Sequence, residues 1–145
     1  MAQDKPEFAI LQDYNGIADR IVTKYPELFH HIDVKQIRCF SITNKDRKPE
    51  KRPYDVQGVP LPIRLDCPYS WYVIVYGREW AEYTEKQKNL IILLSLMHVG
   101  DEPGEVVKPD TQEFACILDH MGRKPWEKDD IKDVLKDHVD FVKSD

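Results

Sequence analysis

The chain has 145 residues, of which 41% are hydrophobic and 32% are charged, and its formal net charge at pH 7 is −5. This length is typical of one domain, and the composition excludes a disordered, fibrous or membrane-embedded chain. The negative charge argues against a protein whose main task is to neutralise nucleic acid, although a local basic patch is compatible with it. We therefore expect a single domain over residues 1–145.

The cysteines and the apolar segments indicate the compartment. Three cysteines lie far apart in the sequence and form no CxxC motif: Cys39, Cys67 and Cys116. This spacing favours buried free thiols over a disulfide framework or a zinc knuckle. The N-terminus is acidic where a signal peptide requires positive charge, and the longest apolar stretch, residues 90–99, is about half as long as a membrane span. We expect a cytoplasmic protein with no membrane segment.

The first third of the chain predicts a helix followed by a strand. Pro26 marks the end of a helix over residues 7–24, because the residue before a proline is pushed out of the helical region. Residues 34–42 alternate and are rich in β-branched side chains, which predicts a strand. The helical stripe recurs at steps of three and four: Phe8, Leu11, Tyr14, Ala18, Ile21, Val22 and Tyr25.

Residues 44–62 are rich in proline and charge, and they predict a long exposed loop with a short edge strand near residues 59–65. The loop contains the basic residues Lys45, Arg47, Lys48, Lys51 and Arg52. Acidic residues are interspersed among them and only one aromatic residue is present. A solvated loop is therefore the favoured interpretation, and phosphate binding is the alternative.

The middle of the chain predicts a buried strand and a central helix. Residues 71–76 read Trp-Tyr-Val-Ile-Val-Tyr, with large side chains on both faces, so we expect both faces of this strand to be covered. Thr84 and Gln87 form a capping-box pattern that begins a helix over residues 84–98. The second half of this helix is apolar nearly all round, which is typical of a helix at the centre of a fold.

The last third of the chain predicts helices over residues 110–121 and 127–142, with Trp126 anchoring the turn between them. The predicted strands cluster between helices rather than alternating with them, which indicates an α+β fold. We expect a short, mostly antiparallel sheet packed against the buried central helix, with further helices at the C-terminus.

Ser95 and His98 are the only polar residues in the apolar half of the central helix, and their spacing places them on one face. Buried polar groups need partners, and we expect these in Asp110, Glu113 or His120. In a structural interpretation, His98 is a core histidine bonded to a carboxylate or carbonyl, and the two acidic residues cap a helix.

Several segments resemble the putative phage metallopeptidases, small zincin-like proteins of phages and prophages. The resemblance runs from about residue 16 to residue 126 and includes the leading helix and the first strand. It also includes Gly-Arg-Glu-Trp at 77–80, Tyr-Thr-Glu-Lys-Gln-Lys at 83–88, Lys-Pro-Asp-Thr-Gln-Glu-Phe at 108–114, and Gly122 with Trp126. It implies a small zincin-like domain.

The resemblance also implies an HExxH motif on the central helix, in which two histidines bind zinc and the glutamate activates a metal-bound water. Residues 94–98 read Leu-Ser-Leu-Met-His here. Leu94 stands at the first histidine, Ser95 stands at the glutamate, and only His98 matches. A serine hydroxyl without its own activator is too weak a base to replace the glutamate.

A further family ligand is implied at the opening of the next helix, where this chain has Pro109 in place of a histidine but keeps Asp110 and Glu113. A catalytic zinc site needs three protein ligands and an open position for water. His98 and one of these carboxylates supply too few ligands, so we expect no cofactor and no catalytic residue. Leu94, Ser95, His98, Asp110 and Glu113 are then positions of a degenerate site.

Three functions compete on this sequence. The favoured one is a catalytically degenerate metallopeptidase-like protein of a phage or prophage, acting as a non-enzymatic binding or accessory protein for an unknown protein partner. The alternative is a zinc-dependent hydrolase or peptidase with a rearranged site around His98, Asp110, Glu113 and His120. The last is a nucleic-acid-associated accessory protein that uses the loop at residues 45–52, which the acidic chain disfavours.

Overall fold

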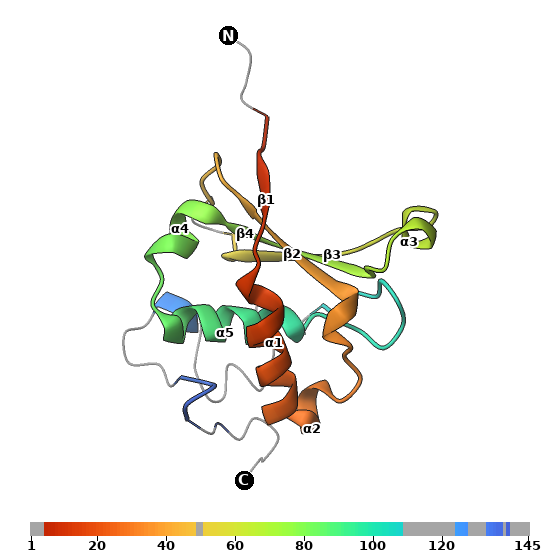
Figure 1. Cartoon of the computed structure of the whole chain (residues 1–145). Coiled ribbons are helices and arrows are strands. Elements are labelled where there is room, and N and C mark those ends of the chain that lie inside the picture. The colour runs from red at the N-terminus through yellow and green to blue at the C-terminus, as the bar shows by residue number, and fades with distance from the viewer. Residues whose placement is uncertain (1–4, 49–50, 109–123, 128–132, 138, 140–145) are drawn as a thin grey trace.

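The structure is a computed structural model that describes residues 5–48, 51–108, 124–127, 133–137 and 139 (Figure 1). Its fold is α+β, as the sequence predicts. The strands are β1 (Phe8–Ile10), β2 (Ile37–Ile42), β3 (Tyr54–Gly58) and β4 (Trp71–Tyr76). The helices are α1 (Asp13–Lys24), α2 (Pro26–Phe29), α3 (Ile63–Asp66), α4 (Gly77–Glu82) and α5 (Glu85–Leu96), and 3₁₀ turns occur at Val34–Gln36 and Pro125–Glu127.

The strands form one four-stranded mixed sheet in the order β1-β2-β4-β3. β1 pairs antiparallel with β2, and β3 pairs antiparallel with β4, whereas the two central strands, β2 and β4, run parallel. The predicted mostly antiparallel sheet is thus confirmed at its outer pairings. The parallel pairing of β2 with β4 is possible because a long connection that contains β3 and α3 separates them.

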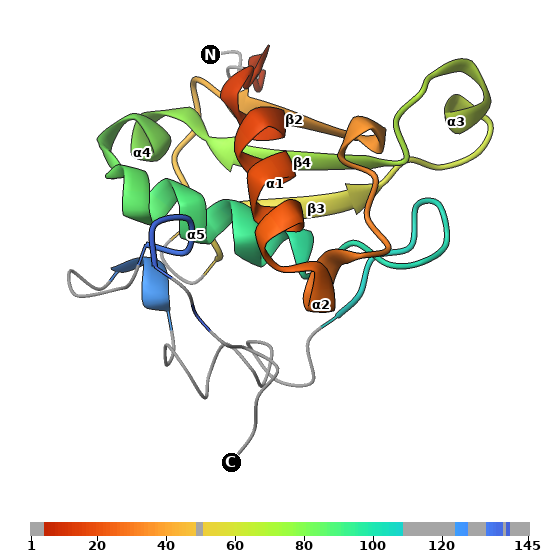
Figure 2. The ribbon, with the colours of Figure 1, turned by 60° about the horizontal axis from the view of Figure 1, so that its bottom comes forward.

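One face of the sheet packs against α1 and α5, which both lie on the same side of it (Figure 2). Successive side chains of a strand point to opposite faces, and the inward set of β4 is fully or nearly fully buried. α5 crosses beneath the sheet, and every residue from Asn89 to Leu96 is buried. The predicted buried central helix is confirmed, and the structure places residues 94 and 95 at the core.

The start of α5 follows the predicted capping box. The side chain of Thr84 accepts a hydrogen bond from the backbone N–H of Gln87, and the Gln87 side chain bonds back to the Thr84 N–H. Such reciprocal bonds satisfy backbone groups that the first turn of a helix leaves without partners. Trp126 is buried beside this end of α5, and its carbonyl accepts a hydrogen bond from the Gln87 side chain. Its predicted role in the turn between the two C-terminal helices concerns segments that lie largely outside the described residues.

The predicted first helix is wrong over its first turn, where residues 8–10 form β1 and the helix begins only at Asp13. Phe8 and Leu11 fit a helical stripe by spacing alone. Pairing of β1 with the edge of β2 overrides that local pattern, since Phe8 aligns with Ile42 and Ile10 with Phe40. Phe8 is consequently 54% exposed instead of buried.

Three further boundaries differ from the predictions. The edge strand is β3 at residues 54–58, not 59–65, and the prolines that follow it lead into the short helix α3. The first predicted strand begins at Ile37, because residues 34–36 form a 3₁₀ turn. The strand at 71–76 is correct in its bounds, but only one face is covered, since Tyr72, Ile74 and Tyr76 stay partly exposed.

The structure also bears on the predictions about the cysteines, a membrane segment and the C-terminal helices. Cys39 is a buried free thiol, Cys67 is a partly exposed one, and Cys116 lies outside the described residues. Over the described part of the chain, the structure contains no helix with the length and apolar character needed to cross a membrane. The predicted helix at 110–121 and most of the one at 127–142 also lie outside the described residues. At residues 133–137 the second of these helices is wrong, because the chain forms a turn in which the Asp133 carboxylate accepts from the backbone N–H groups of Leu135 and Lys136.

Candidate functional site

The middle of α5 places Leu94 and Ser95 in the closed interior of the protein. Both residues are 0% exposed. The capping box at Thr84 fixes where the helix begins, and the largely apolar second half of α5 packs against α1 and the sheet. A side chain at position 94 therefore contributes hydrocarbon contacts, and full burial of a leucine is worth roughly 1.5–3 kcal/mol.

The Ser95 hydroxyl is fully engaged within this interior. It donates to the carbonyl of Ile92 at 2.6 Å and lies 2.7 Å from the hydroxyl of Tyr14 on α1. Because the serine proton is used on the carbonyl, the Tyr14 hydroxyl is the donor in the second bond. Burial raises the pKa of Tyr14, which keeps the phenol protonated. The arrangement satisfies both hydroxyls and leaves Ser95 no basic character.

His98 lies just beyond the end of α5 and is 4% exposed. Its Nδ1 is 2.8 Å from the carbonyl of Val107, and its Nε2 is 3.0 Å from the Tyr54 hydroxyl and 3.1 Å from Nη1 of Arg52. A carbonyl can only accept and a guanidinium can only donate. These partners assign the neutral tautomer in which Nδ1 carries the proton and Nε2 accepts.

The electrostatic surroundings of His98 favour this neutral form. Burial lowers the pKa of His98, and the positive charge of Arg52 lowers it further, although the Val107 carbonyl and Asp55 oppose the shift. Arg52 also lies over the ring of Tyr54, with its guanidinium carbon 6.0 Å from the ring centroid. The imidazole is thus held as a hydrogen-bond acceptor toward a cationic side chain.

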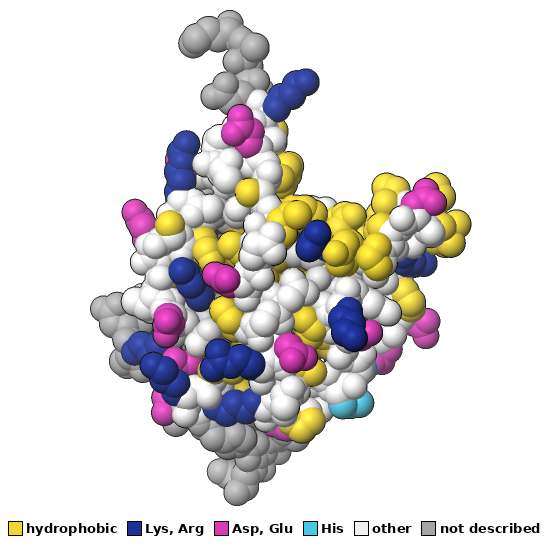
Figure 3. Space-filling view, viewed as in Figure 1, with side chains coloured by type: hydrophobic (Ala, Val, Ile, Leu, Met, Phe, Trp, Pro, Cys, Tyr) yellow, Lys and Arg dark blue, Asp and Glu magenta, His cyan; other side chains and the backbone are white. Residues whose placement is uncertain are grey.

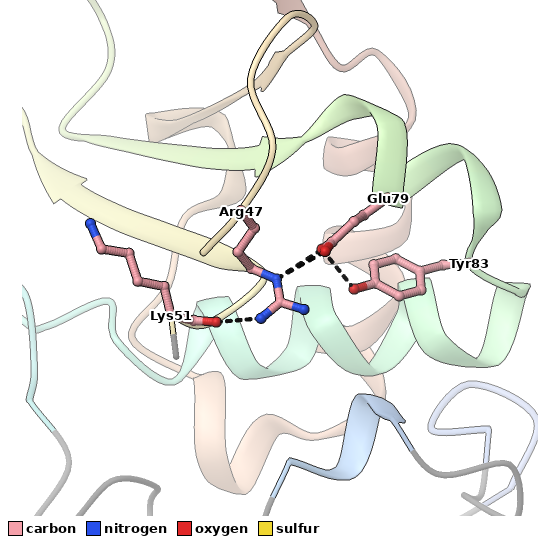
Figure 4. A network of polar contacts seen from close by, with 4 residues as sticks. All are labelled: Arg47, Lys51, Glu79 and Tyr83. Atoms are coloured by element: carbon pink, nitrogen blue, oxygen red, sulfur yellow. Dashed lines mark hydrogen bonds and ion pairs between the residues drawn. The ribbon is translucent and has the colours of Figure 1, made fainter. Parts of the chain in front are cut away.

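A second polar network holds the segment that carries Arg52 (Figure 4). Nε of Arg47 donates to both carboxylate oxygens of Glu79 on α4, at 2.9 and 3.1 Å, and its Nη1 donates to the carbonyl of Lys51. The hydroxyl of Tyr83 donates to the same carboxylate. Burial, followed by the charge of Glu79, raises the pKa of Tyr83 to about 12. These bonds join Lys51, the residue before Arg52, to α4 through the Arg47 side chain.

The described side chains around residues 94–98 do not fit a catalytic metal ion. Position 94 offers hydrocarbon, the Ser95 hydroxyl is engaged, and the Nε2 lone pair of His98 already accepts from Arg52. A metal ion at Nε2 would also meet the like charge of the guanidinium. Over the described residues, no group of three or more histidine, cysteine, aspartate or glutamate side chains could hold a metal ion.

The structure brings Ser95 and His98 to separate partners rather than to one shared site. The bond from His98 to a backbone carbonyl agrees with the interpretation of a core histidine. Asp110, Glu113 and His120, the expected partners, lie outside the described residues. Sequence analysis named Tyr14 in the first helical stripe and Arg52 in the basic loop, but it identified neither of them, nor Tyr54, as a partner of Ser95 or His98.

Comparison with known protein families identifies the family to which this chain belongs. A family model described as "Putative phage metallopeptidase" matches residues 6–138 of this chain. Because the match covers nearly the whole sequence, the chain belongs to this family. No curated protein and no solved structure matches the chain.

Proposed function

We propose that this member of the phage metallopeptidase family is a non-catalytic protein that keeps the family's frame and serves a binding or accessory role. The observation that carries the proposal is the environment of His98. Its Nε2 accepts hydrogen bonds from Arg52 and Tyr54, so a guanidinium cation stands where a ligand histidine would present its lone pair to a metal. The fold is then used for recognition, with a protein as the partner.

The environment of Ser95 supports the loss of general-base chemistry. A glutamate at this position would have to receive a proton from a metal-bound water. The Ser95 hydroxyl instead donates to the Ile92 carbonyl and accepts from Tyr14, both inside the protein. Leu94 supports the loss of metal binding in the same way, because a fully buried leucine offers hydrocarbon where a metal ligand would be needed.

The basic loop gives less support to nucleic-acid binding. Arg47 directs its guanidinium to Glu79 and the Lys51 carbonyl, and Arg52 directs its guanidinium to His98. Arginines held in this way are less available to phosphates, which need several free cations for firm binding. We also propose a cytoplasmic location, which the free thiols of Cys39 and Cys67 support.

The experiment is a zinc titration of the purified chain by calorimetry at pH 7, together with metal analysis of protein prepared without added zinc. We expect substoichiometric metal and no specific zinc binding. The companion variant carries Leu94→His with Ser95→Glu, and its matched control carries Leu94→Gln with Ser95→Gln. We expect the histidine–glutamate variant to bind zinc more tightly than the wild-type chain. The glutamine control should bind no more zinc than the wild-type chain.

One chelator-removable zinc per wild-type chain, lost in His98→Asn, would overturn the proposal and favour a rearranged metallohydrolase site. If the histidine–glutamate variant gains no zinc affinity, the proposal that this chain is non-catalytic stands. The result would then contradict only the explanation that the residues at 94 and 95 account for the lost metal site. Both outcomes are read only on variants whose circular dichroism spectrum matches the wild type.

A further inference from the structure

The outer edge of β1 presents backbone groups that no described strand pairs with. β1 is at the edge of the sheet, and all of its residues are exposed. The carbonyl of Glu7 accepts from the Thr43 N–H, and the Leu11 N–H donates to Cys39, so odd-numbered residues direct their backbone groups toward β2. The alternation of an antiparallel ladder then directs the N–H and C=O of Phe8 and Ile10 away from the sheet.

The same two residues carry exposed apolar side chains. Phe8 is 54% exposed and Ile10 is 42% exposed. Their side chains lie on the face of the sheet opposite α1 and α5, beside Ile42 and Phe40 of β2. Figure 3 shows hydrophobic side chains gathered beside β1 and continuing toward α3. An open edge that is also apolar is a template for pairing with another strand.

We propose that β1 pairs antiparallel with β1 of a second copy of this chain, about a two-fold axis at Ala9. In this register Phe8 faces Ile10 of the second copy, and each exchanges N–H···O bonds with the other in both directions. The same contact is repeated by symmetry, so the interface is self-complementary. The two sheets become one continuous sheet across the axis.

The ends of β1 select this register. Residue 6 is a proline and has no N–H to donate, so pairing centred on Phe8 would place Pro6 opposite Ile10 and lose a bond. Pairing centred on Ile10 would place Phe8 opposite Gln12, the residue before α1, where the chain is already helical in its backbone angles. Only the register centred on Ala9 uses all the outward groups of Phe8 and Ile10.

Charge and composition favour a second copy over a nucleic acid. The register joins apolar side chains into rows across the axis, from Phe40 and Ile10 of one copy to Phe8 and Ile42 of the other. A nucleic acid would need cations along this edge, whereas aromatic and aliphatic residues are typical of protein interfaces.

The test is analytical ultracentrifugation of the wild-type chain from about 1 to 300 µM, a range that covers weak and firm dimers. We expect a dimer, and a dissociation constant at least about tenfold higher for Phe8→Lys, because a lysine on an edge strand opposes pairing. The matched control is Leu65→Lys, which changes an apolar residue that is 78% exposed on α3. It should leave the dimer within about twofold of wild type.

A cross-link tests the register. Ala9→Cys would place two thiols on the axis with Cα atoms about 4.5 Å apart, within disulfide range, so mild oxidation should yield a covalent dimer. Gln57→Cys on the other edge strand serves as the control and should not cross-link above the wild-type background. Ile10→Lys replaces Phe8→Lys if the latter does not fold.

A wild-type chain that stays monomeric over this range contradicts the proposal. So does a dimer that Leu65→Lys abolishes and Phe8→Lys does not, since the interface would then lie at α3. A dimer that neither lysine weakens, or an Ala9→Cys variant that does not cross-link, also contradicts it. None of these results bears on the metal-binding prediction for residues 94–98.

Discussion

The middle of α5 and the residue just beyond its end have different surroundings, although they are close together in the sequence. At the middle, Leu94 and Ser95 are fully enclosed and contact only the interior. Just beyond the end, His98 is almost as buried but is surrounded by polar groups that come from other segments, namely Arg52, Tyr54 and the Val107 carbonyl. The first stretch belongs to the apolar core, and His98 forms a polar junction with other segments.

The difference shows how depth in the protein limits which polar side chains a position can hold. In the interior, a polar side chain costs free energy unless its hydrogen bonds are made, so this stretch holds hydrocarbon and one fully paired hydroxyl. At the end of the helix, a buried histidine is tolerated because a neighbouring loop supplies hydrogen-bond donors to it. The following predictions test this contrast, from the largest expected effect to the smallest.

Leu94→Ala should lower the free energy of unfolding by about 2–5 kcal/mol, because it removes fully buried hydrocarbon and leaves a cavity. Urea denaturation followed by circular dichroism measures the change. Leu65→Ala is the matched control, since the same substitution at a side chain 78% exposed should cost less than about 0.5 kcal/mol. Equal effects at the two positions would contradict the interpretation of residue 94 as core.

The hydroxyl pair of Tyr14 and Ser95 should behave as one unit. Ser95→Ala should cost about 1–3 kcal/mol, because it leaves the buried Tyr14 hydroxyl without its acceptor. The double variant with Tyr14→Phe should cost less than the sum of the single variants, since it removes both ends of the bond. A double-mutant cycle by urea denaturation measures the coupling, and strictly additive effects would contradict the bond.

His98 should make stability depend on pH. Its pKa in the folded protein is lowered below the ordinary value of 6.5, mainly by burial and then by Arg52. The unfolded chain therefore binds a proton more readily, and the free energy of unfolding should fall as the pH drops below 6.5.

The expected loss is at most about 1.4 kcal/mol per pH unit, and it should stop below the folded pKa. Denaturation curves between pH 5 and pH 7.5, roughly the range in which a histidine titrates, measure it. His98→Asn should remove this part of the pH dependence, while the carboxylates contribute equally to both proteins. An unchanged pH profile in the variant would show that His98 is not held neutral.

The smallest expected effect concerns the network that anchors the Arg52 segment. Glu79→Gln should lower stability by about 1 kcal/mol, because the Arg47 side chain is only 10% exposed and loses a charged acceptor. Asp46→Asn is the control, since its ion pair with Arg78 has side chains that are 59% and 73% exposed and should contribute almost nothing. Thermal unfolding of both variants measures the difference.

Local patterns predicted β4 and α5 well, because each is long enough to show a clear period and α5 carries its own capping box. β1 could not be predicted, since three residues fit a helical stripe equally well and only pairing with β2 decides between the two structures. The edge strand β3 was misplaced by a few residues for a similar reason. Its position depends on antiparallel pairing with β4 rather than on the nearby prolines.

The candidate site likewise has residues that the sequence could predict and partners that it could not. The sequence singled out Ser95 and His98, since polar residues inside an apolar helix need partners. It could not supply Tyr14 or Arg52, which lie 81 and 46 residues from the groups they contact. Contacts over such separations are set by how α1 and the loop before β3 fold onto α5, and no local pattern contains that information.

The most direct test of the central claim is the state of the His98 imidazole. Two-dimensional ¹H–¹⁵N NMR of the ring nitrogens at pH 7, with and without equimolar zinc, reports the tautomer and any metal bond. The account predicts a neutral ring protonated at Nδ1, with Nε2 accepting a hydrogen bond, and no change on adding zinc. A zinc-induced shift of the Nε2 resonance to that of a metal-bound nitrogen would contradict it.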